Sequence, residues 1–168
     1  MSSETFTTAM FLMAAIISAG VLINAVFPVI YTLSGTIASS SHKVDERLST
    51  DVKIVTTYAN GDDKNARIWL KNVGTGRIAD ADVRKGDAFL GGQGNFVRLT
   101  WKEKDPGTLA NGEWTHRILE DTNNYWDPGE TLYIEGKAAE VPAKGDIVYF
   151  QFVLPSGLSR TTTFTASN

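Results

Sequence analysis

Four carboxylates gather in the stretch EDTNNYWDPGE, residues 120–130, and these side chains are the best suited in the sequence to bind a metal ion. They are Glu120, Asp121, Asp127 and Glu130. Hard cations such as Ca²⁺ prefer carboxylate and carbonyl oxygens as ligands. The spacing matches no EF-hand loop, however, and the tripeptide DPG at 127–129 is an ordinary turn signal. We therefore predict a solvated acidic turn without a bound metal.

Other residues that serve catalysis in many enzymes are sparse. The two histidines, His42 and His116, have no nearby partner in the sequence for a Ser-His-Asp or metal-hydrolase site. The segment GDAFLGGQG, residues 86–94, is rich in glycine but lacks the GK[ST] ending of a phosphate-binding loop, so we interpret it as a wide turn between strands. Cysteine is absent, which excludes disulfides, thiolate zinc sites and thiol nucleophiles. The sequence predicts a protein that is not an enzyme and needs no cofactor.

Charge divides the chain of 168 residues into two parts. Residues 1–42 carry one charged side chain, Glu4, whereas charges are frequent from Lys43 onward. The formal net charge of −3 argues against a nucleic-acid partner, since such a protein needs a basic face for the phosphates. We predict an apolar helix over residues 1–48 and one folded domain over residues 49–168.

The apolar run is long enough to cross a membrane. Residues 9–31 are 23 in number, and 19 of them are hydrophobic. As a helix they span about 35 Å, against about 30 Å for the hydrocarbon layer of a bilayer. The flank MSSETFTT has no Lys or Arg, so we expect a retained segment rather than a cleaved export signal. The flanking charges leave the orientation of the segment open.

The small, polar and proline residues within this apolar run indicate contacts between helices. The residues that we predict to make these contacts are Ala14, Ala15, Ser18, Ala19, Gly20, Asn24 and Pro28. Small residues spaced by four let helix backbones approach closely in an apolar medium. Asn24 needs a partner for its amide there, and Pro28 frees the carbonyl of Asn24 from its usual helical hydrogen bond. A plain membrane anchor is the alternative reading of the small residues.

Helical spacing continues beyond Tyr31. Ile30, Leu33, Ile37, Val44 and Leu48 follow one another at intervals of three, four, seven and four residues. The pattern predicts one helix that reaches about Leu48. The serine-rich residues 39–41 leave a loose tether as the alternative.

From Asp51 the pattern alternates with a period of two, which is typical of half-buried strands. The segments expected to be strands are 51–59, 65–73, 77–84, 96–102, 113–119, 131–136, 146–154 and 159–165. Turn signals such as KDPGT and WDPGE separate them. Short strands at this spacing predict an immunoglobulin-like β-sandwich.

Most aromatic residues of the sandwich are expected in its core. Trp69 alternates with Ile68 and Leu70, so we expect it on the outer face, and Tyr125 and Trp126 lie beside a turn. We predict these three aromatic residues as candidates for an interface on the sandwich. A membrane-tethered module that binds a carbohydrate or an ion through Trp69 or the Asp127 turn is an alternative function.

Several stretches in order along the chain resemble the archaellum accessory protein G family (FlaG). They are SSETFTTAMFLMAAIISAGVLINAVFPVIYTLSGT, DERLSTDVKIV, IWLKNVGTGRI, GDAFLG and NYWDPGETL. More loosely, the architecture is similar to archaellins and other type IV pilin-like filament subunits. The resemblance implies a non-catalytic structural protein of the archaellum, the archaeal flagellum used for motility.

The resemblance also implies a location and partners. The helix would be held by lipid in the cytoplasmic membrane, with the sandwich outside the membrane. The partners would be copies of the same chain, the companion archaellum protein F and the surface-layer protein. A principal filament subunit is the alternative. Pilin-like precursors carry a short basic leader that ends in Gly, and nothing of that kind precedes Ser2, so we expect an unprocessed chain or one that is already mature.

Overall fold

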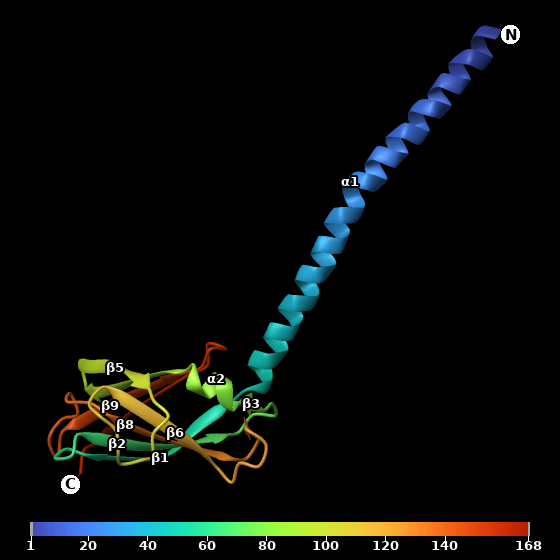
Figure 1. Cartoon of the computed structure of the whole chain (residues 1–168). Helices are drawn as coiled ribbons and strands as arrows, with labels where there is room; N and C mark the ends of the chain where they lie inside the picture. The colour runs from blue at the N-terminus through green and yellow to red at the C-terminus, as the bar shows by residue number, and fades with distance from the viewer. Residues whose placement is uncertain (1, 168) are drawn as a thin grey trace. The chain divides into compact units, whose positions relative to one another are not determined.

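The computed structural model describes the backbone of residues 2–167 and the side chains of residues 3–37 and 49–167. Helix α1 (Ser2–Ser49) comes first, and the strands of a β-sandwich follow it (Figure 1). The chain divides into two compact units, Met1–Val44 and Asp45–Asn168. The predicted fold class, an apolar N-terminal helix followed by a β-sandwich, is confirmed.

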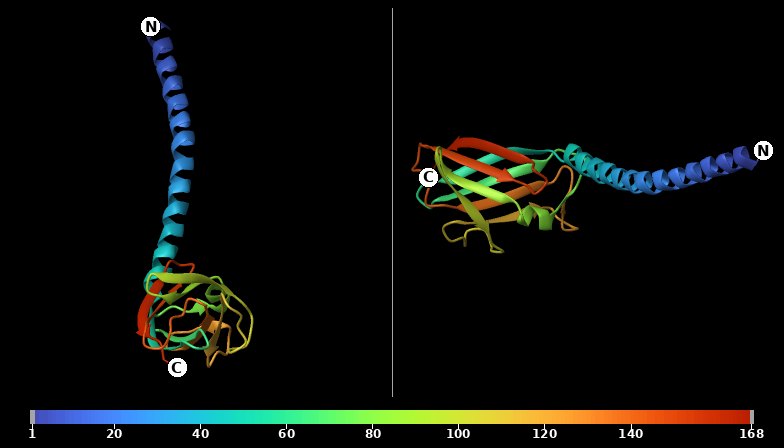
Figure 2. Two further views of the ribbon diagram at one scale, coloured as in Figure 1. Left: turned by 90° about the vertical axis from the view of Figure 1, so that its left-hand side faces the viewer. Right: turned by 90° about the horizontal axis from the view of Figure 1, so that it is seen from above.

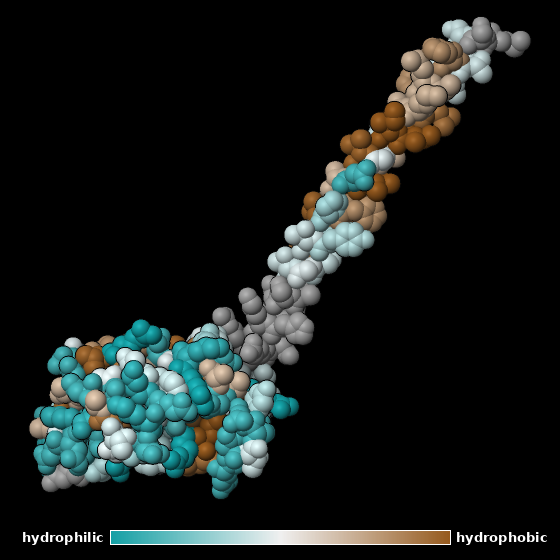
Figure 3. Space-filling model, in the orientation of Figure 1, coloured by the Kyte–Doolittle hydropathy of each residue, from teal (hydrophilic) through white to brown (hydrophobic). Residues whose placement is uncertain are grey.

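Helix α1 is one continuous element of 48 residues, about 72 Å long at about 1.5 Å per residue. Residues 39–41 are helical rather than a loose tether. Threonine hydroxyls in the helix donate to carbonyls one turn earlier, and Thr32 Oγ1 lies 2.9 Å from the Pro28 carbonyl oxygen. Figure 3 shows the apolar side chains along this helix and a largely hydrophilic surface on the sandwich.

The sandwich contains one short helix besides its strands. The strands are β1 (Val52–Asn60), β2 (Asn65–Asn72), β3 (Ile78–Ala79), β4 (Asp87–Gly92), β5 (Asn95–Trp101), β6 (Glu113–Leu119), β7 (Tyr125–Trp126), β8 (Thr131–Lys137), β9 (Ile147–Val153) and β10 (Ser159–Thr165), and the short helix is α2 (Asp80–Arg84). Strands β3 and β7 pair with each other in a small separate sheet.

The long strands follow the order β1-β2-β8-β6-β5-β4-β9-β10. All neighbours are antiparallel except β5 and β6, whose short parallel pairing connects β1-β2-β8-β6 to β10-β9-β4-β5. Figure 2 shows the strands of the sandwich from two further sides. At the opposite edge, Arg160 of β10 donates to the Val52 carbonyl and to the Asp51 carboxylate. The two groups, β1-β2-β8-β6 and β10-β9-β4-β5, reproduce the strand order of an immunoglobulin-type sandwich.

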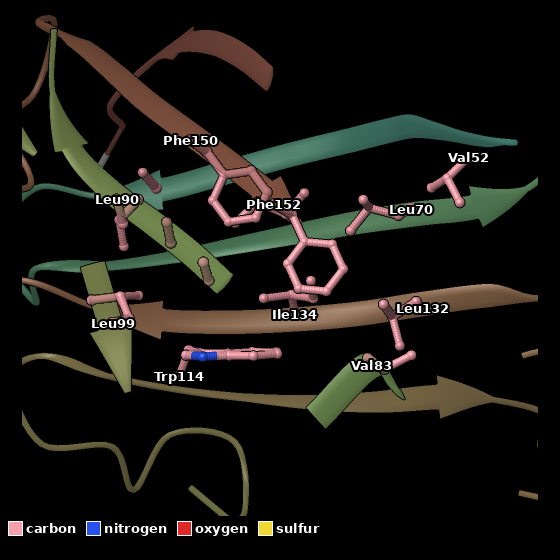
Figure 4. Packing of buried hydrophobic residues seen from close by; sticks show 14 of the residues in the cluster. Val52, Leu70, Val83, Leu90, Leu99, Trp114, Leu132, Ile134, Phe150 and Phe152 are labelled. Atoms are coloured by element: carbon pink, nitrogen blue, oxygen red, sulfur yellow. The ribbon is translucent and has the colours of Figure 1, made fainter. Parts of the chain in front are cut away.

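Side chains from both sheets fill the core, as Figure 4 shows. Trp114 of β6 is fully buried, and its ring meets that of Phe152 edge to face at a centroid distance of 5.5 Å. Gly136 lies opposite Trp114 in the sheet, and a Cβ there would come within 2.7 Å of Leu99 Cδ1. The sheets approach closely because this position has no side chain.

Two expectations for the sandwich were wrong. Residues 77–84, predicted as a strand, form the two-residue strand β3 and helix α2. Asp80 and Asp82 lie in the first turn of α2, where carboxylates are favourable, and Val83 is buried. Residues 86–94, interpreted as a turn, contain β4, which pairs with both β5 and β9. The glycines of β4 interrupt the alternation of apolar and polar residues by which a strand is predicted. At Gly91, an added Cβ would come within 2.4 Å of the Asn95 carbonyl oxygen.

The turn after β2 is hydrogen-bonded to residues 49–51, which lie just before β1. Backbone N–H groups of residues 73–76 donate to the carbonyls of Ser49 and Asp51 over 2.8–2.9 Å. Ser49 is the last residue of α1, and carbonyls at a helix end lack partners within the helix. The buried Asn72 shapes the turn, since its side-chain oxygen accepts the Gly74 N–H.

We expect Gly74→Ala to destabilise the sandwich by about 1–3 kcal/mol, because the added methyl forces backbone shifts. An ideal Cβ at Gly74 would lie 2.3 Å from the Ser49 carbonyl oxygen and 2.5 Å from the Asp51 nitrogen. Gly92→Ala is the matched control, since the nearest atom to its Cβ would be 3.7 Å away. Thermal unfolding of the full chain in detergent measures both, and equal melting temperatures for the two variants would contradict the contact.

Candidate assembly surface and polar sites

The largest apolar surface among the described residues lies on α1. Every large hydrophobic side chain from Phe6 to Ile37 is exposed. The stretch Ser3–Ile37, 35 residues, is long and apolar enough to cross a membrane by length and composition. A helix that is apolar on all sides requires cover on all sides, from lipid or from protein.

The structure places the seven predicted helix-contact residues on the exposed surface of α1. The fold of the single chain does not require a glycine at position 20, because an added Cβ there would meet nothing within 4 Å. The Asn24 side chain has no hydrogen-bond partner among the described residues, whereas the hydroxyls of Thr7, Thr8 and Thr32 bond to carbonyls of their own helix. Gly20 and Asn24 therefore remain available to another molecule.

Two of the three predicted interface aromatics lie on the surface of the sandwich. The half-buried Trp69 packs edge to face on Tyr133 with ring centroids 5.2 Å apart. The Tyr133 hydroxyl donates to the buried Glu135, and burial together with that carboxylate raises the pKa of the phenol. Tyr125 is exposed, and the Arg77 guanidinium lies 5.1 Å from its ring centroid.

Trp126 is a correction, because it is fully buried and therefore inaccessible to a partner. It follows Tyr125 in β7 and pairs with Ile78 of β3. Adjacent residues of a strand point to opposite sides, so the exposure of Tyr125 turns Trp126 inward. Its indole N–H donates to the Glu130 carbonyl over 2.9 Å.

Three of the four carboxylates of the acidic turn accept hydrogen bonds from within the turn itself. Asp121 Oδ1 accepts the backbone N–H groups of Asn123 and Asn124, and Asp127 Oδ2 accepts from the Asn123 amide. Glu130 Oε2 accepts the Asp127 N–H. Among the described residues, no three His, Cys, Asp or Glu side chains are grouped so that they could hold a metal ion. The ion-binding alternative through the Asp127 turn gains no support from this geometry.

His116 lies in a polar network that the sequence did not reveal. Its Nε2 is 2.7 Å from Asp80 Oδ1, and its Nδ1 accepts the Trp101 indole N–H over 3.0 Å. Arg84 lies 2.6 Å from the Asp80 carboxylate and 5.2 Å from the Trp101 ring centroid. Burial lowers the pKa of His116, which the Asp80 hydrogen bond and charge oppose and the Arg84 charge assists.

These four residues border an open polar depression of about 320 Å³ on the sandwich. Asp80 and His116 are 36 positions apart in the chain. Helix α2, which carries Asp80 and Arg84, is part of the segment that sequence reasoning assigned to a strand. The signal in retrospect is the spacing of four between Asp80 and Arg84, which is that of a helical ion pair.

A family model described as archaeal-type flagellin matches residues 7–164, which include most of α1 and the strands up to the last residue but one of β10. The chain belongs to this family. A relative in Archaeoglobus fulgidus, described only as an uncharacterized protein, is 28% identical over 138 residues, which are 80% of each chain.

Solved structures with the same fold come from the archaellum. The flagellum of Methanospirillum hungatei strain JF1 matches with a TM-score of 0.69 at 14% identity, over 96% of this chain and 93% of that one. The archaellum periplasmic stator protein FlaG of Sulfolobus acidocaldarius matches with a TM-score of 0.52 at 19% identity, over 68% of this chain and 99% of that one.

Membership of the archaeal-type flagellin family confirms the predicted role as a non-enzymatic structural subunit of the archaellum. It also confirms the predicted location. The protein is either anchored in the membrane with its sandwich outside or part of an extracellular filament.

Proposed function

We propose that copies of this archaeal-type flagellin family member assemble into a filament, in which their α1 helices form a bundle and their sandwiches face outward. The supporting observation is the length of the apolar surface on α1. Its large hydrophobic side chains are exposed from Phe6 to Ile37, a length of about 48 Å, whereas the hydrocarbon layer is about 30 Å thick. Burial of all of these side chains in lipid would require a tilt of roughly 50°, beyond the usual range of about 0–40°. Neighbouring α1 helices in a bundle can cover the whole apolar surface, because their cover is not limited to the thickness of a bilayer.

The predicted contact residues support a bundle with more than one neighbour per helix. At about 100° per residue, Ala14, Ala15, Ser18 and Ala19 lie on one side of α1. Gly20, Asn24 and Pro28, spaced by four, lie on another side roughly 150° away. Two sides with small residues suit close contacts with two neighbours, whereas a dimer uses one side. We propose that the Asn24 amide donates to a carbonyl of a neighbouring helix.

A stationary accessory part of the archaellum is the second candidate. FlaG and the periplasmic stator complex of FlaF and FlaG from Sulfolobus acidocaldarius share the fold, each with a TM-score of 0.52. In this role α1 would lie in the membrane lipid, and the sandwich would bind a protein F partner or the surface-layer protein. Trp69 and Tyr125 are then the proposed contact residues.

The experiment that tests the proposal follows the full chain in two settings. Purified protein is imaged by electron microscopy as detergent is removed, and tagged protein is located in sheared surface filaments and in the cell envelope. We expect filaments in the first setting and enrichment in the sheared fraction in the second. Retention in the envelope together with a protein F partner would favour the accessory role. Dispersed monomers without detergent would contradict both roles.

A further inference from the structure

His116 closes a ring of four side chains that joins α2 to strands β5 and β6. Trp101 donates to His116, His116 meets Asp80, Asp80 pairs with Arg84, and Arg84 lies over Trp101. The His116 side chain is 4% exposed, so water provides little alternative to these partners. The hydrogen bonds of the ring therefore depend on which nitrogens of the His116 imidazole carry a proton.

The partners of His116 determine which nitrogen carries the proton. The Trp101 indole nitrogen is a donor only, so His116 Nδ1 must be an unprotonated acceptor. The single proton of the neutral ring then lies on Nε2 and is donated to Asp80. A second proton on Nδ1 would set two donors against each other across 3.0 Å. Protonation therefore breaks the bond to Trp101, even though Asp80 remains a favourable neighbour.

The ring holds α2 over the end of the core. Val83 of α2 is fully buried and is labelled among the core side chains in Figure 4. Gly86 follows α2, and a Cβ there would come within 2.8 Å of the Phe152 ring. Asp80 and Arg84 are the side chains of α2 in the ring that reach β5 and β6. Release of Trp101 loosens its contact with Arg84, which is one of the two links by which the ring holds α2.

We propose that His116 is a proton-operated latch, so that its protonation frees the Trp101 indole of β5 and thereby loosens the contact between Trp101 and Arg84 of α2. Three sets of groups face this site. Asp80 and Arg84 come from α2, Trp101 and Trp114 flank the imidazole, and Glu103, Lys104 and Asp105 border the depression. This proposal concerns the sandwich alone and stands whether the protein is a filament subunit or an accessory part.

The sign of the pH dependence follows from the lowered pKa of His116. The unfolded chain takes up the proton near pH 6.5, before the folded chain does. Stability from this site is therefore fully present above about pH 6.5, and it is lost as pH falls toward the folded pKa. A test between pH 7.5 and pH 5 stays above the range in which carboxylates ordinarily titrate.

Hydrogen exchange of residues 80–86, measured on the full chain in detergent and corrected for intrinsic rates, tests the latch. We expect about a tenfold rise in exchange between pH 7.5 and pH 5. His116→Gln supplies an amide oxygen for Trp101 and an amide N–H for Asp80, so its exchange is expected to stay constant. His42→Gln removes the other histidine and is expected to retain the rise. Unchanged exchange in the wild type, or an equal rise in His116→Gln, would overturn the proposal.

A second variant keeps the test informative where His116→Gln fails to fold. Trp101→Phe removes the N–H group that opposes protonation of Nδ1. We expect the pKa of His116, followed by nuclear magnetic resonance of the ring nitrogens, to rise relative to the wild type. A histidine with a packing role only would show the same pKa in both proteins, and that result would also overturn the latch.

Discussion

Ile17→Lys is expected to abolish filament assembly and to leave the sandwich folded. Ile17 lies within the apolar stretch of α1 and is 66% exposed in the single chain, so the substitution disrupts no contact there. In a bundle, the same position is covered by apolar side chains. A lysine at the centre of an apolar helix costs about 2.5–3.5 kcal/mol, which is about a hundredfold in the equilibrium for adding each subunit.

Val55→Lys is the matched control for this prediction. Val55 is 60% exposed and lies at the bulge of β1, where it has no partner in β2. A charged side chain at an exposed bulge is tolerated. Electron microscopy after detergent removal is expected to show filaments for the wild type and Val55→Lys only. Filaments of normal length from Ile17→Lys would show that α1 is not the buried element of the assembly.

Trp114→Ala is expected to remove about 3–5 kcal/mol of stability, the usual loss for a large buried aromatic side chain. Trp114 is fully buried, meets Phe152 edge to face, and lies at the point where β6 pairs with β5. Its loss leaves a cavity between the sheets that Gly136, directly opposite, has no side chain to fill. Total stabilities of domains are about 5–15 kcal/mol, so this loss is a large share of the total and is expected to lower the melting temperature clearly.

Trp69→Ala provides the comparison for Trp114. Trp69 is half-buried on the outer face, where its edge-to-face pair with Tyr133 is worth about 1 kcal/mol. Guanidinium unfolding of the full chain in detergent, followed by circular dichroism, measures both variants. Similar losses for the two substitutions would contradict the assignment of Trp114 to the core and Trp69 to the surface.

The local pattern of residues predicted most of the secondary structure. The uninterrupted apolar run with helical spacing to Leu48 specified α1, because a helix depends on contacts within about one turn. Alternation placed Ile68 and Leu70 inside and Trp69 farther out, as the strand period requires. Strand β4 was missed because its glycines carry no pattern. Residues 77–84 were assigned wrongly because their two buried residues, Ile78 and Val83, are five positions apart and set no strand period.

The burial of Trp126 and the ring around His116 could not be predicted from the spacing of residues along the chain. Trp126 and Tyr125 are adjacent, and only the pairing of β7 with β3 decides which of them faces the core. The ring around His116 joins residues from α2, β5 and β6, and its members Asp80 and His116 are 36 positions apart in the chain.

The sequence by itself determined an apolar helix long enough to cross a membrane, a β-sandwich and the absence of cysteine chemistry. Each of these is a property of composition or of spacing over a few residues. The tertiary structure alone decided that His116 is held between Asp80 and Trp101, that Trp126 is buried and that Gly74 donates to the Asp51 carbonyl. Such contacts are set by strand order and register, which depend on packing between segments that no local pattern records.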